Sequence, residues 1–179
     1  MVELKMLVVD KIVSDMLFEF KHHQIIDKKY VNKNNKWEEI GTHEIREWNE
    51  DKRVWITEYF LQQIKRGGSV IGAYDGNRLV GFCCLDGYLC GESAKYANIT
   101  MLFVDDDYKR KGIGKALFRK ISECAIGMGG EKMFISAIPS VETVSFYFSM
   151  GCIDAKEIIS EYIDTEKDRY LEYILRRNK

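Results

Sequence analysis

One short loop gathers the residues of this sequence that are best suited to binding a phosphate. Residues 108–115 read Tyr-Lys-Arg-Lys-Gly-Ile-Gly-Lys, just before a helical pattern. Two glycines let the main chain approach a ligand, and the unpaired N–H groups of a helix's first turn carry partial positive charge. The loop also holds four cationic side chains, Lys109, Arg110, Lys111 and Lys115, in a chain of net charge −1. We therefore expect a local anion cradle, for which a diphosphate is the natural ligand.

Two common phosphate-binding loops fit this stretch badly. A Walker loop requires Ser or Thr after its Gly-Lys pair, but Gly114-Lys115 is followed by Ala116, and no glycine stands at the required upstream position. A Rossmann turn requires Gly or Ala where Leu117 stands, and a tighter join between strand and helix. A basic turn exposed to solvent stays open as the alternative to a phosphate site.

The neighbouring elements must position this loop between a strand and a helix. Tyr96–Val104 has the composition of a largely buried strand, and Gly112–Met128 carries apolar residues at helical spacing. Upstream, Asp75-Gly76-Asn77 predicts a tight turn between two strands. The other elements expected from residue 69 onward are strands at Ser69–Tyr74, Arg78–Leu85 and Lys132–Ala137, a loop at Asp86–Lys95, a helix at Val141–Met150, and a terminal strand pair at Ile153–Ile159 and Tyr170–Arg176.

The first 65 residues predict one short strand followed by two helices. A short strand at Leu4–Val9 leads into helical spacing from Asp10, and the polar stretch Lys28–Glu39 has the composition of a loop. Asp51 is a suitable N-cap for a helix that ends at about Lys65, before two glycines. The order of elements is therefore mixed α/β.

Length and composition favour one domain, residues 1–179, with 46% hydrophobic residues available for its core. The near-neutral charge provides no long-range field for nucleic acid or an anionic membrane. No segment has the apolar length of a membrane span or signal peptide, so we expect a soluble cytoplasmic protein. Five cysteines and three histidines lack the spacing of a metal site, so no metal is expected.

Two segments resemble the GNAT superfamily of N-acetyltransferases. The family's loop has the pattern Arg/Gln-x-x-Gly-x-Gly/Ala, after a strand that ends in valine and a short acidic or proline-containing turn. Residues 104–117 are similar to it, with Lys109 in place of the Arg or Gln. Because that position contributes mainly through its backbone N–H, we expect the loop to tolerate the change. Residues 140–152 resemble the family's later helix, Asn-x-x-Ala-x-x-Phe-Tyr-x-x-x-Gly-Phe, with Ser140, Thr143 and Cys152 as departures.

The resemblance covers Ser69–Arg176 and implies a GNAT-like fold, in which about four helices flank a mostly antiparallel sheet of six to seven strands with one splayed strand pair. It implies acetyl-coenzyme A as co-substrate and direct transfer of the acetyl group to a primary amine of a small molecule or peptide. The positions that would bind the coenzyme are Leu102, Phe103, Val104, Lys109, Arg110, Lys111, Gly112, Ile113, Gly114, Lys115, Ser140 and Tyr147.

The same resemblance implies catalytic roles for two of these residues. Tyr147 would protonate the departing thiolate as general acid, and the backbone N–H of Leu102 would stabilise the oxyanion. The base is open, because Asn98 stands where some relatives have Glu. A water relay or a carboxylate of the preceding loop, Asp86 or Glu92, is left for that role.

The motifs do not specify the acceptor. In the family it is selected by segments that here correspond to Lys21–Trp48 and Ser160–Arg169. The second segment carries four acids that could attract a cationic amine, although a solvated hairpin explains them equally well: Glu161, Asp164, Glu166 and Asp168. Two other functions stay open, a non-catalytic acyl-coenzyme A sensor, favoured by Asn98, and a protein that binds nucleotide phosphates. The resemblance also leaves open a homodimer, formed by pairing of terminal strands.

Overall fold

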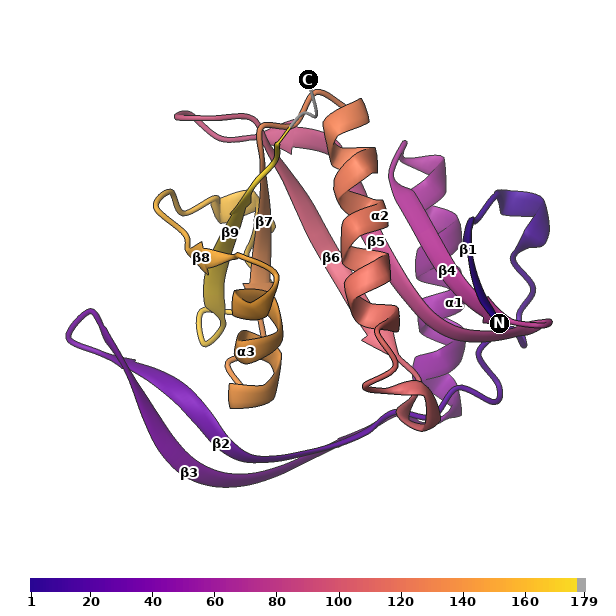
Figure 1. Ribbon diagram of the computed structural model, residues 1–179, viewed down its shortest axis with the longest axis horizontal. Helices are drawn as coiled ribbons and strands as arrows, with labels where there is room; N and C mark the ends of the chain where they lie inside the picture. The colour runs from indigo at the N-terminus through magenta and orange to yellow at the C-terminus, as the bar shows by residue number, and fades with distance from the viewer. Residues whose placement is uncertain (177–179) are drawn as a thin grey trace.

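The centre of the protein is a seven-stranded sheet with its strands in the order β1-β4-β5-β6-β7-β9-β8 (Figure 1). The computed structural model describes residues 1–176, so residues 177–179 of the expected domain lie outside the described part. The strands of this sheet are β1 Val2–Met6, β4 Ser69–Asp75, β5 Arg78–Cys90, β6 Tyr96–Val104, β7 Lys132–Ala137, β8 Ile153–Asp154 and β9 Arg169–Ile174. Every neighbouring pair is antiparallel except β6 and β7. The mostly antiparallel sheet of a GNAT-like fold is confirmed.

Helices cover both faces of this sheet (Figure 1). The helices of the described residues are α1 Glu50–Lys65, α2 Ile113–Gly127 and α3 Val141–Ser149, with short 3-10 turns η1 Val9–Lys11, η2 Asp106–Tyr108 and η3 Ser160–Tyr162. Ile56 of α1 shares one core with Val70, whereas Leu117 of α2 shares another with Ile71. Consecutive β4 residues face opposite cores because side chains alternate along a strand. Strands buried on both faces have nearly continuous apolar sequences, which explains why β4, β6 and β7 could be predicted from the sequence.

The N-terminal third differs most from expectation. The helix predicted from Asp10 is absent: the chain forms only η1 and a series of turns there. Leu17 and Phe20 are nevertheless buried, in the core beneath α1. Their apolar spacing therefore reflects burial in an irregular segment rather than one face of a helix. The N-cap of α1 is Asn49, not Asp51, because the Asn49 side chain accepts a hydrogen bond from the Lys52 N–H at 2.9 Å.

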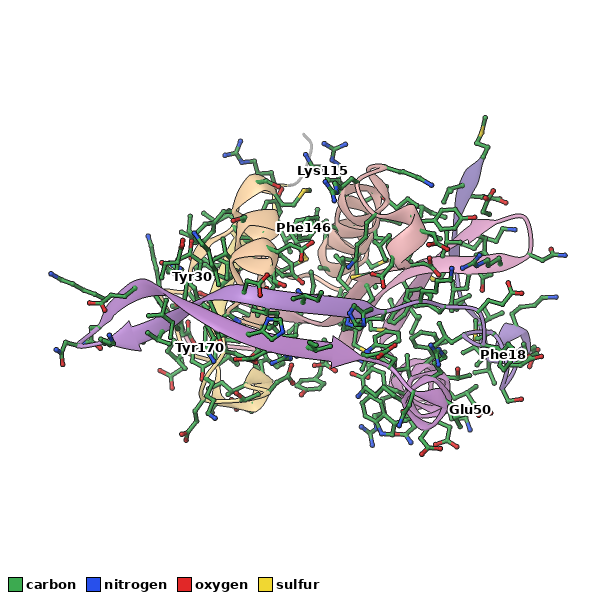
Figure 2. The ribbon with its side chains drawn as sticks, turned by 90° about the horizontal axis from the view of Figure 1, so that it is seen from below. Phe18, Tyr30, Glu50, Lys115, Phe146 and Tyr170 are labelled. Carbon is green, nitrogen blue, oxygen red and sulfur yellow. The ribbon has the colours of Figure 1, made fainter. Side chains whose placement is uncertain are left out.

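A long β-hairpin replaces the loop predicted at Lys28–Glu39. β2 (His23–Lys33) and β3 (Lys36–Glu47) form a separate two-stranded sheet. Asn34 and Asn35 both have positive φ, 51° and 62°, as a two-residue hairpin turn requires. Figure 2, a view from below, shows the hairpin lying across the underside of the molecule. The loop prediction was wrong because opposite charges, rather than apolar side chains, pair across these strands: Lys28 with Glu39 and Lys33 with Glu38.

Two further boundaries also change. β5 continues to Cys90, into the segment 86–95 predicted as a loop, and the chain turns at Gly91, where φ is 111°. The terminal strand pair is confirmed only in part. β8 is two residues long, and the rest of the connection to β9 is irregular apart from η3.

Arg169 holds the distal part of the hairpin against the sheet. Its guanidinium donates two hydrogen bonds to the Asp154 carboxylate, at 2.7 and 2.8 Å. It also lies about 5 Å from the ring centroids of Tyr30, Trp37 and Phe148. Two of these rings belong to the hairpin and the third to α3, so one buried cation joins three parts of the fold.

Candidate active site

A cavity of about 1550 Å³ opens where β6 and β7 separate. The two strands pair only from Tyr96 to Ile99 on the β6 side, although β6 continues to Val104. The β7-facing edge of residues 100–104 therefore has no strand partner, and the splayed pair is present. Lining residues come from the hairpin, α1, β6, the start of α2, α3 and residues 161–168. The volume exceeds the ~300–1,000 Å³ of an ordinary small-molecule site, so it can hold two ligands.

The start of α2 presents free backbone N–H groups to this cavity. No side chain caps this helix, whereas Asn49 caps α1 and Ser140 caps α3. The first helical hydrogen bond runs from the Ala116 N–H to the Gly112 carbonyl at 3.0 Å, which leaves the N–H groups of residues 113–115 without helical partners. Arg110 and Gly112 have positive φ values of 59° and 82°. This turn and helix start together form the backbone geometry of an anion cradle.

Most of the basic side chains of the loop border the cavity. Lys109, Arg110 and Lys115 line it, together with Gly112, Ile113 and Gly114. Lys109 also pairs with Asp106 at 2.7 Å. Lys111 is not among the lining residues. Its ammonium instead donates to the Asp107 carbonyl at 2.8 Å and lies over the Tyr108 ring.

The unpaired end of β6 supplies the second row of backbone groups. Leu102, Phe103 and Val104 all line the cavity, and their contact with the coenzyme stays a prediction. The N–H of Leu102 stays the predicted oxyanion donor. Gly114 lies close to this strand, because a Cβ added there would be 3.3 Å from Phe146 and 3.7 Å from Val104. A side chain at position 114 would therefore require Phe146 to shift by a few tenths of an ångström.

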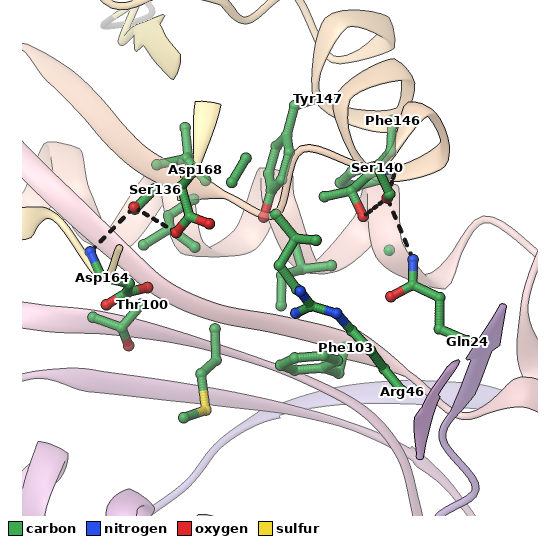
Figure 3. Close-up of a pocket in the computed structure, with 18 of the residues that line it drawn as sticks. Gln24, Arg46, Thr100, Phe103, Ser136, Ser140, Phe146, Tyr147, Asp164 and Asp168 are labelled. Atoms are coloured by element: carbon green, nitrogen blue, oxygen red, sulfur yellow. Dashed lines mark hydrogen bonds between the residues drawn. The ribbon is translucent and has the colours of Figure 1, made fainter. Parts of the chain in front are cut away.

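Tyr147 of α3 belongs to the core that also contains residues of β5, α2 and β7. It is 6% exposed, packs edge-on against Phe118 and Phe146, and borders the cavity. In Figure 3 its hydroxyl points into the cavity. Burial, followed by the neighbouring Cys83 and Cys152, raises the pKa of this phenol, so it stays protonated at neutral pH and can donate.

Ser140 is already engaged within the protein. Its hydroxyl accepts the Thr143 N–H at 3.1 Å and donates to the Thr143 hydroxyl at 2.8 Å, and the Gln24 amide donates to it at 3.4 Å. A serine hydroxyl has one donor and two acceptor sites. A ligand would therefore have to displace Gln24 to bond this side chain.

The acids proposed as base occupy different places. Asp86 lines the cavity and accepts hydrogen bonds from Gln63 and Asn98, both at 2.7 Å. Asn98 also lines the cavity, as a donor to Asp86. Glu92 is not among the lining residues, and its backbone N–H donates to Glu157. The structure thus brings together Asp86 and Asn98 but not Glu92.

Two acids of the segment before β9 complete this side of the cavity. Ser136 of β7 accepts the Asp164 N–H at 3.1 Å and donates to the Asp168 carboxylate at 2.9 Å (Figure 3). Asp164 is exposed at the cavity's edge. Partial burial, and then the charges of Asp168 and Asp86, raise its pKa to about 6. Burial raises the pKa of Asp168 as well. The two segments predicted to face the acceptor, Lys21–Trp48 and Ser160–Arg169, both contribute to the wall.

Sequence reasoning missed several lining residues. Arg46 and Gln24 come from the hairpin, which was expected to be a loop, and Tyr59 comes from α1. Tyr59 donates to the Thr100 hydroxyl at 2.8 Å. The period-two alternation of the hairpin could have indicated them, since Gln24, Ile26, Glu44 and Arg46 all face the cavity. No spacing in the sequence singles out Tyr59.

Comparison with known proteins shows the family of this chain. A profile described as the acetyltransferase (GNAT) family matches residues 33–151. The chain therefore belongs to the GNAT acetyltransferase family. A search of curated proteins gave no match.

Three solved structures show the same fold. Nourseothricin acetyltransferase aligns with a TM-score of 0.68 at 15% identity over 98% of this chain and 99% of that one. A putative streptothricin acetyltransferase from Bacillus anthracis, in complex with acetyl coenzyme A, aligns with a TM-score of 0.65 at 17% identity over 97% and 99%. The ribosomal-protein-S18-alanine N-acetyltransferase from Escherichia coli aligns with a TM-score of 0.59 at 14% identity over 100% and 97%.

Among residues 1–176, no helix is long and apolar enough to cross a membrane. Within that same range, no group of His, Cys, Asp and Glu side chains is arranged to hold a metal ion.

Proposed function

We propose that this protein transfers the acetyl group of acetyl-coenzyme A to a primary amine of a small molecule or peptide. The observation that carries the proposal is the uncapped start of α2, whose free N–H groups share one cavity with the unpaired edge of β6 and the hydroxyl of Tyr147. Family membership supports the acetyl donor, and the acetyl coenzyme A complex of a structural neighbour supports its identity.

The residues present fit the coenzyme. The N–H groups of Ile113, Gly114 and Lys115 would hold the diphosphate, with Lys109 and Arg110 as neighbouring cations. The edge of β6 at Leu102, Phe103 and Val104 would bind the pantetheine arm through its backbone groups. Phe146 packs against the position of Gly114 and keeps the walls of this channel close together.

The chemistry requires an oxyanion donor and a proton donor. The bound coenzyme supplies an acetyl thioester. The Leu102 N–H would stabilise negative charge on the carbonyl oxygen, and Tyr147 would give its proton to the departing sulfur. Because burial keeps the pKa of Tyr147 above its usual value, the phenol is available as an acid throughout the neutral range.

The amine must lose a proton before it attacks, since its pKa is about 10. Asn98 has no basic group, and its amide is committed to Asp86. Asp86 is the one of the two predicted carboxylates that borders the cavity, so we propose that it receives the proton, directly or through water.

The acceptor class follows from the charge of the cavity. Acidic residues border the part of the wall formed by β5 and residues 161–168, which suits a cationic amine. Structural neighbours are named for small-molecule acceptors and for a ribosomal-protein alanine, so both classes belong in a test.

The test is thiol release from acetyl-coenzyme A against a panel of amines and peptides, with product mass confirming an acetyl group on nitrogen. Turnover on at least one acceptor supports the proposal. Coenzyme A binding without turnover on any acceptor would favour the non-catalytic sensor, for which Asn98 in the place of a Glu base is the supporting observation.

A further inference from the structure

Three carboxylates meet in one part of the cavity, which we call the acidic end: Asp86, Asp164 and Asp168. Two of them accept hydrogen bonds from uncharged side chains. Gln63 and Asn98 donate to Asp86, and Ser136 donates to Asp168. Asp86 and Asp168 are near enough to Asp164 for their charges to raise its pKa. Asp164 is therefore repelled by both of the other acids.

The surrounding elements do not neutralise this charge. Arg46 of β3 acts on Asp168, but it also lies 3.9 Å from Glu44 of its own strand. Tyr59 of α1 faces Asp164 as a neutral phenol, because burial raises its pKa. At the rim, Glu161 and Glu166 accompany Lys167. Against three carboxylates and one arginine, at least two negative charges remain unbalanced.

Asn98 gives an independent sign of a ligand at the acidic end. The residue is 5% exposed and borders the cavity. Its Nδ2 donates to Asp86, which fixes the orientation of the amide, and its Oδ1 is buried without a hydrogen-bond partner in the described residues. A buried acceptor without a donor is costly, so a donor from a ligand would satisfy it.

We propose that the acceptor carries at least two cationic amino groups, one held at the acidic end by Asp164 and Asp168 beside Asn98 Oδ1, while another reacts. This inference rests on the proposed acetyltransferase function. The reacting nitrogen enters as an ammonium and loses one proton to Asp86 or water. Its C–N bond to the acetyl carbon forms as the C–S bond breaks, and Tyr147 delivers its proton to the departing sulfur. The nitrogen then loses its second proton, which passes through water to the Tyr147 phenolate and restores the phenol. The anchoring ammonium is unchanged.

Matched amines test the proposal directly. Cadaverine and pentylamine, like putrescine and butylamine, have the same chain and differ in one ammonium. We expect kcat/KM for the diamine to exceed that for the monoamine by roughly 100-fold, and the advantage to shrink as added salt screens the acidic end. Equal kcat/KM for the two members of each pair would overturn the inference.

A double variant locates the effect. Asp164→Asn with Asp168→Asn keeps the shape of both side chains and removes their charge. We expect the ratio of diamine to monoamine kcat/KM to fall to within about threefold of one, whereas Asp15→Asn, an exposed carboxylate outside the cavity, leaves the ratio unchanged. Thermal unfolding of each variant shows whether it is folded. A folded double variant that keeps the full diamine advantage would overturn the inference.

A binding measurement separates this inference from the proposed function. Cadaverine is titrated calorimetrically into protein saturated with coenzyme A, which lacks an acetyl group to transfer. Binding that weakens at least about 30-fold in the double variant supports the dication site, even if no amine releases thiol and the acetyltransferase proposal fails. Absence of cadaverine binding at millimolar concentration overturns the dication site, whether or not other amines are acetylated.

Discussion

The two charged parts of the cavity are built in different ways. The proposed phosphate loop is formed by consecutive backbone N–H groups at the start of α2, where Gly112 is the N-cap and Gly114 lies in the first turn. The acidic end is formed by side chains from β5, β6 and residues 164–168, which are distant in the sequence. A site made from consecutive backbone leaves a motif, and a site made from scattered side chains does not. The donor is therefore readable from the sequence, whereas the acceptor site requires the fold.

The same difference predicts what each part tolerates. We expect the proposed phosphate loop to tolerate Lys109 where the family has Arg or Gln. Lys111 turns away from the cavity toward Asp107. We expect coenzyme binding to be impaired more by added side-chain volume in this loop than by loss of one of its charges. At the acidic end we expect loss of charge to matter more than added volume, because its carboxylates act through charge. Neutral side chains donate hydrogen bonds to Asp86 and Asp168.

The largest effect is expected from filling the phosphate loop. A Cβ at position 114 would already lie 3.3 Å from Phe146, and Gly114→Val adds two further methyl groups beside the free N–H groups of the helix start. We expect KM for acetyl-coenzyme A to rise about 100-fold or more, measured by initial rates. Gly127→Ala in the same helix is the control, since a Cβ there meets nothing within 4 Å. A normal KM in Gly114→Val would show that the coenzyme binds elsewhere.

Tyr147→Phe removes a proton donor and keeps the ring packing against Phe118 and Phe146. We expect kcat to fall roughly 100-fold, while KM for acetyl-coenzyme A changes by less than about threefold. Steady-state kinetics at saturating acceptor measures both. An unchanged kcat would assign Tyr147 to packing alone and leave the thiolate to be protonated by solvent.

The pH dependence of acceptor preference probes the acidic end. The folded-state pKa of Asp164, about 6, lies above its ordinary value near 4, so the carboxylate becomes neutral as pH falls through 6. Asp86 and Asp168 repel its charge, and Tyr59 faces it as a neutral group. The diamine-to-monoamine ratio of kcat/KM should therefore fall about tenfold from pH 7.5 to pH 5. A ratio independent of pH contradicts a role for this carboxylate.

The smallest effect is expected at the hairpin anchor. Arg169→Lys keeps one charge but loses the paired hydrogen bonds to Asp154 and the planar contact with three rings. A loss of about 1–2 kcal/mol would lower Tm by roughly 2–8 °C. Arg119→Lys, on the exposed side of α2, is the matched control. Equal melting temperatures for the two variants would mean that the hairpin is held by its other contacts.

The sequence predicts the strands that are buried on both faces, because their apolar residues form continuous runs. Tyr96–Val104 and Lys132–Ala137 have the predicted bounds because both faces of these strands are covered. The hairpin could not be predicted in the same way, because its strands are rich in Lys, Glu and Asn, and their pairing depends on partners across the turn.

Some residues of the candidate site could likewise be predicted from the sequence, and others could not. The residues of the proposed phosphate loop border the cavity except Lys111, and the buried Tyr147 also borders it. Asp86 and Glu92 were indistinguishable as acids of one loop. They separate in the structure because β5 extends through Asp86, whereas Glu92 lies beyond the turn at Gly91. That difference arises from strand length, which charge and spacing do not encode.

The most direct test of the account is calorimetric titration of acetyl-coenzyme A into the purified protein, with ATP titrated in parallel. Free N–H groups at the start of α2 together with the open edge of β6 predict a single site per chain with micromolar affinity for acetyl-coenzyme A, and at least about 30-fold weaker binding of ATP, which has phosphates but no pantetheine arm. No binding of acetyl-coenzyme A at millimolar concentration, or equal binding of ATP, would contradict the account.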